Sequence, residues 1–340
     1  MKILVTGGTG YIGSHTSVVL LQKGYDVVIA DNLCNSKRVV VDRIEELGGR
    51  KVSFYKCDLR DEPALREVFA KEKIDAVIHF AGLKAVGESP THPLTYYDNN
   101  LSSTLTLLRV MEDFGVKSIV FSSSATVYGD KATPPLKEDV PLPMSATNPY
   151  GFTKIMIEQI LKDYCHAHAD FNAVLLRYFN PVGAHESGRI GEDPSGIPNN
   201  LAPYITQTLV GKRDKLHVFG NDYPTPDGTC IRDYIHVQDL AAGHVAAIKL
   251  FENHTCGIKI YNLGTGHGFS VLEVINAFSK AAGRQVPYEF VGRREGDLPE
   301  SYADADKAYR EMGWKAEKTL DDMCRDALHW QEMNPNGYDE

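Results

Sequence analysis

The chain has 340 residues, 43% of them hydrophobic, and a formal net charge of −9 at pH 7. A chain of this length buries about three quarters of its unfolded surface, so it needs no disulfide or metal to hold a core together. The negative charge argues against a nucleic-acid-binding surface, and any phosphate site must rest on a few local basic residues.

The six cysteines are scattered without a Cys-x-x-Cys pair. This spacing predicts reduced thiols and no metal site. The apolar run at the N-terminus is too short for a signal peptide, and no later stretch approaches the roughly 20 apolar residues of a membrane span. We therefore expect a soluble, cytoplasmic protein that uses no membrane.

Short β-branched runs alternate with longer amphipathic segments over the first half of the chain. The strand candidates are, in order, Ile3–Thr6, Val27–Ala30, Val52–Tyr55, Ala76–Phe80, Ser118–Ser122 and Ala173–Tyr178. Helical patterns lie between most of them. This alternation predicts an α/β fold with a doubly wound, Rossmann-like parallel sheet.

Beyond Pro181 the pattern loosens into stretches rich in Gly, Pro and Asn, and a strand pattern returns at Ile258–Leu263. We predict one domain over residues 1–180, and we expect elements within about 232–263 to belong to it as well. Residues 181–340 are expected to form a second, smaller α/β lobe at the C-terminal end.

A glycine-rich turn joins the first strand to the first helical pattern, in Thr6-Gly7-Gly8-Thr9-Gly10-Tyr11-Ile12-Gly13. Missing side chains permit a tight turn, and they let a pyrophosphate approach the N–H groups at a helix N-terminus. Glycine is common in turns of every kind, but the position of this turn at the start of a βαβ unit favours dinucleotide binding.

The second strand ends in Asp31-Asn32. An acidic side chain at this place bonds the adenosine ribose hydroxyls and repels a 2′-phosphate, which favours NAD over NADP. Lys37 and Arg38 keep NADP open as an alternative, because basic residues are what a 2′-phosphate needs.

Small or polar residues follow the ends of the later strands. They are Asp58, Ala81-Gly82-Leu83-Lys84, Ser122-Ser123-Ser124 and Tyr178-Phe179-Asn180. Ligands of doubly wound sheets bind at these carboxyl ends. A similar turn at 264–268 is instead expected to be structural, because Ser270 and Glu273 have the spacing of a capping box.

Tyr150 and Lys154 are four residues apart, which puts them on one face of a helix. Asn148 is the expected N-cap and Pro149 the first helical residue, so Tyr150 falls in the first turn. An ammonium one turn away and the positive end of the helix both favour an ionised phenol. The pair is therefore a candidate general base with a neighbouring cation, although such pairs also occur by chance.

The glycine turn, Ser124 and the Tyr150-x-x-x-Lys154 pair together resemble the extended short-chain dehydrogenase/reductases. Three longer runs are similar to the UDP-glucose 4-epimerases within that family, namely 79–89, 177–185 and 232–237. The resemblance extends from residue 1 to about residue 335. It implies an isomerase of carbohydrate metabolism that epimerises C4 of a UDP-hexose through a transient 4-keto intermediate.

The resemblance also implies catalytic roles. Tyr150 takes the proton of the sugar 4-hydroxyl as tightly bound NAD takes the hydride, Ser124 hydrogen-bonds the same oxygen, and Lys154 holds the nicotinamide ribose and lowers the Tyr150 pKa. Related dehydratases carry an acidic residue directly after the catalytic Ser or Thr. This chain has Ala125-Thr126 there, so we expect no elimination of water.

The remaining contacts are implied residue by residue. Those expected for NAD, in the first domain, are Gly7, Gly10, Tyr11, Ile12, Gly13, Asp31, Asn32, Asn35, Ser36, Asp58, Leu59, Phe80, Ala81, Lys84, Asn99, Ser122, Tyr150, Lys154 and Tyr178. Those expected for the UDP-sugar, mostly in the smaller lobe, are Lys84, Ser124, Thr126, Tyr150, Phe179, Asn180, Asn200, Leu201, His217, Val218, Phe219, Arg232, Tyr234, Arg294, Asp297 and Ser301. The diphosphate is assigned to Asn180, Asn200, Arg232 and Arg294, and the uridine ribose to Asp297.

One position bears on the substrate range. Epimerases restricted to glucose and galactose commonly have a tyrosine where this chain has Ser301. Serine leaves room for a 2-acetamido group, so we expect UDP-N-acetylglucosamine and UDP-N-acetylgalactosamine to be interconverted too. Related epimerases are commonly homodimers, and the same is expected here. The alternatives are another sugar-nucleotide enzyme, such as a 4,6-dehydratase, and a noncatalytic NAD-sensing protein.

Overall fold

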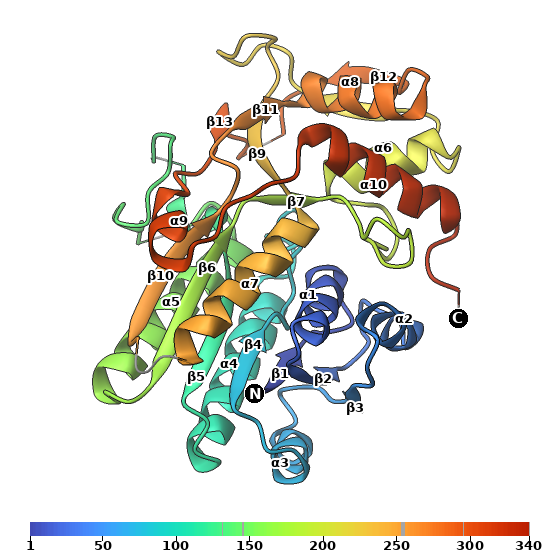
Figure 1. Cartoon of the computed structure of the whole chain (residues 1–340). Helices are drawn as coiled ribbons and strands as arrows, with labels where there is room; N and C mark the ends of the chain where they lie inside the picture. Colours follow the sequence, from blue (N-terminus) through green and yellow to red (C-terminus); the bar gives the residue numbers. More distant parts are fainter. Residues whose placement is uncertain (131, 145, 253–255, 295, 340) are drawn as a thin grey trace. The chain divides into compact units, whose positions relative to one another are not determined.

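The computed structural model describes residues 1–130, 132–144, 146–252, 256–294 and 296–339 (Figure 1). Contacts divide the chain into two compact units. Unit 1 comprises Met1–Gly129, Pro141–Arg177 and Ala241–Tyr261, and unit 2 comprises Asp130–Val140, Tyr178–Leu240 and Asn262–Glu340. The assignment of NAD to one domain and UDP-sugar to the other stays a prediction.

The main sheet has seven strands in the order β10-β6-β5-β4-β1-β2-β3. Their bounds are β1 Lys2–Thr6, β2 Asp26–Asp31, β3 Ser53–Lys56, β4 Ala76–His79, β5 Ser118–Ser124, β6 Asn172–Tyr178 and β10 Ile258–Leu263. The pairs β1–β2, β2–β3, β1–β4 and β4–β5 are all parallel. The strand order reverses between β1 and β4, so the predicted doubly wound fold is confirmed.

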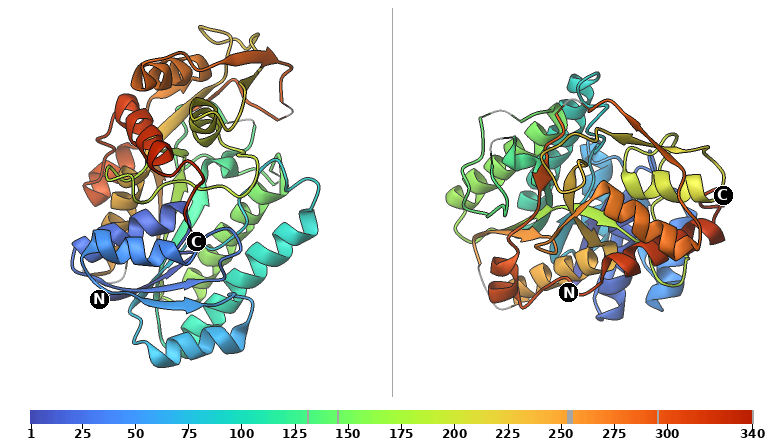
Figure 2. Two further views of the ribbon diagram at one scale, coloured as in Figure 1. Left: turned by 90° about the vertical axis from the view of Figure 1, so that its right-hand side faces the viewer. Right: turned by 90° about the horizontal axis from the view of Figure 1, so that it is seen from above.

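Helices cover both faces of this sheet (Figures 1 and 2). In unit 1 they are α1 Tyr11–Gln22, α2 Val39–Gly48, α3 Glu62–Lys71, α4 Pro93–Asp113, α5 Pro149–Ala167 and most of α7 Val237–Glu252, with a 3-10 turn η1 at Ala125–Tyr128. Apolar residues of α3, α4 and α5, such as Leu65, Leu107 and Ile157, share one core with Leu4 and Val77 of the sheet. Helices α1 and α2 lie on the opposite face.

The start of α5 is set by local chemistry, as predicted. The Asn148 side chain accepts a hydrogen bond from the Gly151 N–H at 2.8 Å, and Pro149 is the first helical residue. This cap satisfies one of the N–H groups that a helix start leaves unpaired. Tyr150 is thereby fixed in the first turn of α5.

Unit 2 is a smaller α/β assembly. Its strands are β7 Asn180–Val182, β9 Ile231–His236, β11 Gly268–Ser270 and β13 Glu300–Ser301 in one sheet, and β8 Leu216–Phe219 with β12 Tyr288–Val291 in another. Its helices are α6 Leu201–Leu209, α8 Val271–Ala282, α9 Asp306–Met312 and α10 Leu320–Met333. Ile205, Phe278 and Met323, all fully buried, join α6, α8 and α10 into one core. The predicted capping box of Ser270 and Glu273 is confirmed at the start of α8.

Among the described helices, none is long and apolar enough to cross a membrane.

Candidate active site

The candidate base and its cation lie beside the carboxyl end of β5. Tyr150 and Lys154 are on one face of α5, and the Lys154 Nζ is 5.8 Å from the Tyr150 ring centroid. The Nζ donates a hydrogen bond to the main-chain carbonyl of Ser122 at 2.7 Å, and it lies 4.8 Å from the ring centroid of Phe121. The Lys154 ammonium is therefore held at the strand end.

Burial governs the protonation of both groups. Burial raises the pKa of Tyr150 above its ordinary value, and a hydrogen bond with Ser124 opposes this shift. Burial lowers the pKa of Lys154 to about 8, against the attraction of Glu158. The role of Lys154 in lowering the Tyr150 pKa stays a prediction, and the hydrogen bond with Ser124 acts in the same direction.

Ser124 is the last residue of β5 and the N-cap of η1. Its Oγ accepts hydrogen bonds from the Thr126 N–H at 3.2 Å and from the Thr126 Oγ1 at 3.0 Å. The predicted Ser124, Tyr150 and Thr126 are thus brought together in unit 1.

A buried ion pair lies one turn further along α5. Glu158 is fully buried and accepts two hydrogen bonds from the Arg177 guanidinium, at 2.9 and 2.7 Å, and one from the Ser123 hydroxyl at 2.6 Å. Glu158 was not predicted from the sequence. Its only sequence signal was the four-residue spacing from Lys154, since Arg177 comes from β6.

Two positions of the glycine turn have no room for a side chain. A Cβ on Gly7 would lie 2.8 Å from the Ala81 main-chain nitrogen, and a Cβ on Gly13 would lie 2.3 Å from the Gly7 carbonyl oxygen. Gly7 also has a φ of +68°. The N-cap of α1 is Gly10, which supplies no capping side chain, and the first turn of α1 has no acidic residue. These features suit the pyrophosphate of a dinucleotide.

Asp31 organises the loop after β2. Its carboxylate accepts hydrogen bonds from the Thr9 N–H at 3.1 Å, the Leu33 N–H at 2.9 Å and the Ser36 Oγ at 3.2 Å. Leu33 has a φ of +61°, a conformation that non-glycine residues rarely adopt. Asp31 thus joins the glycine turn to this loop, and the parts that Thr9 and Leu33 play in it were not predicted from the sequence.

Asp58 lies next to this loop. The Asn32 amide donates to it at 3.3 Å, and Arg60 donates to both of its oxygens. These bonds, led by the one from Arg60, lower the pKa of Asp58 to about 2. Leu59 is buried, whereas Asn35 is exposed.

The loop after β4 is anchored by Asn100, a neighbour of the predicted Asn99. The Asn100 amide bonds the N–H and the carbonyl of Leu83, at 2.8 and 3.0 Å, and also the Thr153 hydroxyl of α5 at 3.0 Å. The Lys84 Nζ lies 6.0 Å from the Tyr11 ring centroid. The half-buried Asn99, Phe80 and Ile12 complete the predicted set in this unit.

In unit 2, two arginines meet one carboxylate. Arg294 donates to both Asp297 oxygens, at 3.1 and 2.8 Å, and a nitrogen of Arg232 lies 3.6 Å from the same carboxylate. Arg232 is held in place because it also donates to the carbonyls of Ile231 and Leu298, both at 2.8 Å. The Arg294 guanidinium lies 5.7 Å from the Phe219 ring centroid.

Ser301 lies opposite Arg232 in the parallel pairing of β13 with β9. The next residue of β9, the buried Asp233, accepts hydrogen bonds from the N–H groups of Thr265 at 2.8 Å, Gly266 at 3.0 Å and Ala303 at 3.1 Å. The turn at 264–268 is therefore structural, as predicted.

Other predicted substrate residues are spread over unit 2. In β8, Val218 is buried, whereas His217 is exposed and lies 3.1 Å from Glu289. Asn180 is opposite the buried Tyr234 in the register of β7 and β9. Asn200 donates to Glu192 at 2.9 Å and precedes Leu201, the first residue of α6. Tyr178 and Phe179 are buried at the end of β6.

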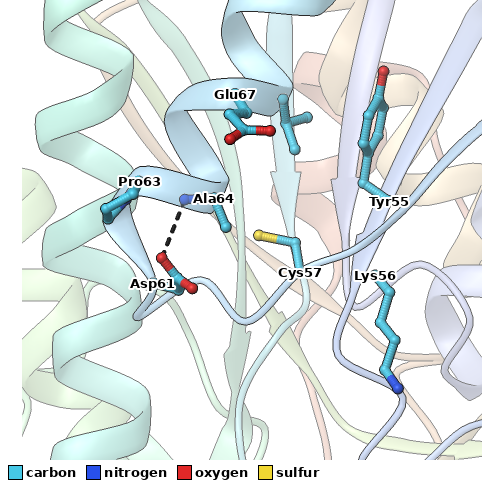
Figure 3. Close-up of a pocket in the computed structure, with 8 residues that line it drawn as sticks. Tyr55, Lys56, Cys57, Asp61, Pro63, Ala64 and Glu67 are labelled. Carbon is cyan, nitrogen blue, oxygen red and sulfur yellow. Dashed lines mark hydrogen bonds between the residues drawn. The ribbon is translucent and has the colours of Figure 1, made fainter.

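A separate cavity of about 310 Å³ lies in unit 1 between β3 and α3 (Figure 3). Tyr55 and Cys57 line it from the side of β3 and Glu67 from α3, and Asp61 caps α3 through the Ala64 N–H. None of its lining residues is a predicted site residue. Within the described ranges, no group of three or more His, Cys, Asp or Glu side chains is placed to hold a metal ion.

Comparisons with known proteins point to one group of enzymes. A family model described as GDP-mannose 4,6 dehydratase matches residues 4–327. A UDP-glucose 4-epimerase of Bacillus subtilis is 59% identical over 99% of both chains. The crystal structure of the UDP-glucose 4-epimerase from Bifidobacterium longum, in complex with NAD+ and UDP, is 56% identical with a TM-score of 0.96, covering 99% of this chain and all of that one. The structure of a UDP-Glc/GlcNAc 4-epimerase from Campylobacter jejuni is 38% identical with a TM-score of 0.84, covering 98% and 99%.

Proposed function

The chain belongs to the UDP-glucose 4-epimerases of the extended short-chain dehydrogenase/reductases, and on that basis we propose that it interconverts UDP-galactose and UDP-glucose. The observation that carries this proposal is the grouping of Ser124, Tyr150 and Lys154 at the end of β5, in a chain with 59% identity to such an enzyme. A dehydratase is disfavoured because Ala125-Thr126 follows Ser124 and offers no carboxylate.

NAD is the cofactor. When bound, it accepts a hydride from C4 of the sugar and returns it, so no net oxidation occurs. The residues that we propose hold it are the glycine cradle at 7, 10 and 13, Tyr11 and Ile12, the Asp31 loop with Asn32, Asn35 and Ser36, and Asp58, Leu59, Phe80, Ala81, Lys84, Asn99, Ser122 and Tyr178. Two features support this assignment. The start of α1 has neither a capping side chain nor an acidic residue, and Gly7 and Gly13 have no room for a Cβ.

Tyr150 is the proposed general base. It takes the proton of the 4-hydroxyl and must return it within the same turnover, because the product has as many protons as the substrate. Ser124 donates a hydrogen bond to the oxygen on which negative charge develops. Lys154, fixed on the Ser122 carbonyl, supplies a positive charge nearby and holds the ribose of the nicotinamide.

Arg232 and Arg294 are the proposed ligands of the diphosphate, with Asn180 and Asn200, and Asp297 that of the uridine ribose. A planar guanidinium can donate two parallel hydrogen bonds to two oxygens of a phosphate. Both arginines already pair with the negatively charged carboxylate of Asp297. Phe179, Leu201, His217, Val218, Phe219 and Tyr234 complete the proposed nucleotide contacts, and Lys84 is a proposed sugar contact. Firm contacts to the nucleotide keep the 4-keto intermediate bound while its hexose ring rotates to present the opposite face.

A wider substrate range rests on Ser301. We propose that the pocket also admits the 2-acetamido group of UDP-N-acetylglucosamine. The half-buried Ser301 lies opposite Arg232 in the strand register, and Arg232 is one of the residues proposed to bind the diphosphate. In the Ser301→Tyr variant, activity on the acetylated pair should fall at least 10-fold while activity on UDP-galactose is kept. Full activity on both pairs would contradict the pocket assignment.

The main proposal is tested with purified protein and UDP-galactose, without added NAD. Conversion to UDP-glucose, followed by NMR, is the expected result. A 4-keto-6-deoxy product would indicate a dehydratase instead. Retained NAD without any turnover would indicate an NAD sensor.

We also propose that the chain is a homodimer in the cytoplasm. Leu94 and Leu105 are exposed, and they lie eleven residues apart on one face of α4, which suits a contact between copies. All six cysteines are free thiols, as in a reducing compartment. Light scattering after size exclusion measures the oligomeric state, and a monomer at micromolar concentration would contradict the dimer.

A further inference from the structure

The hydroxyl of Ser124 has both of its acceptor positions occupied by one residue. The Thr126 N–H and the Thr126 Oγ1 donate to the Ser124 Oγ at 3.2 and 3.0 Å. A serine hydroxyl has two acceptor lone pairs and one donor hydrogen. With both lone pairs engaged, Ser124 can take part in further hydrogen bonds only as a donor.

The proposed reaction needs the Ser124 hydroxyl to donate its hydrogen and not to accept one. A hydrogen bond between Ser124 and Tyr150 already stabilises the ionised phenol. A Ser124 hydroxyl that turned round to accept a proton from the sugar 4-hydroxyl would instead compete with the base. Blocking the acceptor positions removes this unproductive arrangement.

Thr126 itself is held from a second side. A Cβ added to Gly151 would lie 3.3 Å from both the Cβ and the Oγ1 of Thr126, so the first turn of α5 packs directly on this side chain. Gly151 follows Tyr150, and its N–H is bound by the Asn148 cap. The Thr126 side chain thus lies between Ser124 and the first turn of α5, which carries Tyr150.

We infer that Thr126 is a positioning residue that fixes the Ser124 hydroxyl as a hydrogen-bond donor, with its one hydrogen directed at Tyr150 before substrate binds and at the reacting oxygen once substrate is bound. This inference rests on the proposed epimerase function. It gives Thr126 a role through Ser124, whereas a direct contact with the substrate was expected from the sequence. No proton is exchanged by Thr126 or Ser124, because the 4-hydroxyl proton passes to Tyr150 and back.

The first test replaces Thr126 by Val, which keeps the branched shape and the main-chain N–H but removes the donor oxygen. We expect kcat for UDP-galactose to fall about 10-fold, while the KM and the amount of bound NAD stay unchanged. Thr126→Ser restores the donor and should recover kcat to within about twofold. A raised KM with unchanged kcat would overturn the inference in favour of a direct substrate contact.

A double-mutant cycle separates the two roles. If Thr126 acts only through Ser124, then Thr126→Val costs nothing further once Ser124 has been replaced by Ala. The same 10-fold loss in both backgrounds would overturn the inference. Thr126→Ala, which leaves a smaller side chain, is run in parallel and should behave as Thr126→Val does. It also keeps the test decisive if the valine does not fit.

A further readout does not depend on turnover. The tyrosinate absorbance difference between each protein and its Tyr150→Phe counterpart reports the ionisation of Tyr150. It should shift to higher pH in Thr126→Val and return in Thr126→Ser, and an unchanged titration would overturn the inference. Wild-type protein that titrates in this way but does not epimerise UDP-galactose would count against the proposed function alone.

Discussion

The Lys154 ammonium donates to the main-chain carbonyl of Ser122 at 2.7 Å, and it is buried there with a pKa lowered to about 8. An exposed lysine in the unfolded chain titrates near a pKa of about 10.4. Between these two values the unfolded chain holds a proton that the folded chain has released. The contribution of Lys154 to the free energy of unfolding therefore rises with pH over this window. Below pH 8 the buried side chain is charged, and the fold is destabilised by the full free energy of burying that charge.

The Lys154→Met variant should lose this dependence. We expect its free energy of unfolding, relative to the wild type, to fall by about 2 kcal/mol as the pH is raised from 7.0 to 9.5, because the wild type gains stability and the variant does not. Urea unfolding of both proteins at several pH values measures this difference. A difference that stays constant with pH would contradict the burial of a charged Lys154.

Tyr150→Phe removes the proposed base. Turnover of UDP-galactose should fall at least about 100-fold, since general-base catalysis contributes about that much or more. Bound NAD, measured by absorbance after denaturation, should be unchanged. Tyr164→Phe is the matched control, because Tyr164 lies on the same helix away from Ser124, and it should keep nearly full activity. Substantial activity in Tyr150→Phe would mean that another group is the base.

Glu158→Ala removes the carboxylate that pairs with the buried Arg177 guanidinium. Breaking a buried pair in this way costs about 3–5 kcal/mol of stability. Replacing both residues, as Glu158→Leu with Arg177→Met, should cost less than Glu158→Ala alone. Denaturant unfolding measures all three proteins, and a double variant less stable than the single one would show that the pair itself stabilises the fold.

Local rules predicted much of the fold from the sequence. Strand bounds came within one or two residues, and Asn148 caps α5 as expected, because both depend on near neighbours in the chain. The partnership of Glu158 with Arg177 was not predictable in this way, since it forms only when α5 packs on β6. Asp297 was expected to bind a ribose, and its pairing with Arg294 three residues away was not predicted.

Gly13→Ala tests the glycine cradle. A Cβ there would lie 2.3 Å from the Gly7 carbonyl, so the turn must open, and we expect lower stability together with loss of bound NAD. Gly87→Ala is the control, because nothing lies within 4 Å of a Cβ at that position. It should retain both NAD and stability. Equal NAD content in the two variants would contradict the assignment of the cradle.

The Asp233 carboxylate fixes the main chain that follows Ser301. It binds the Ala303 N–H two residues after Ser301, while β9 holds the main chain of Ser301 itself in register. The path of this segment is thereby independent of the side chain at 301. A substitution at position 301 can therefore change the size of the side chain while the main chain around it keeps its course, so variation at this position need not disturb the fold.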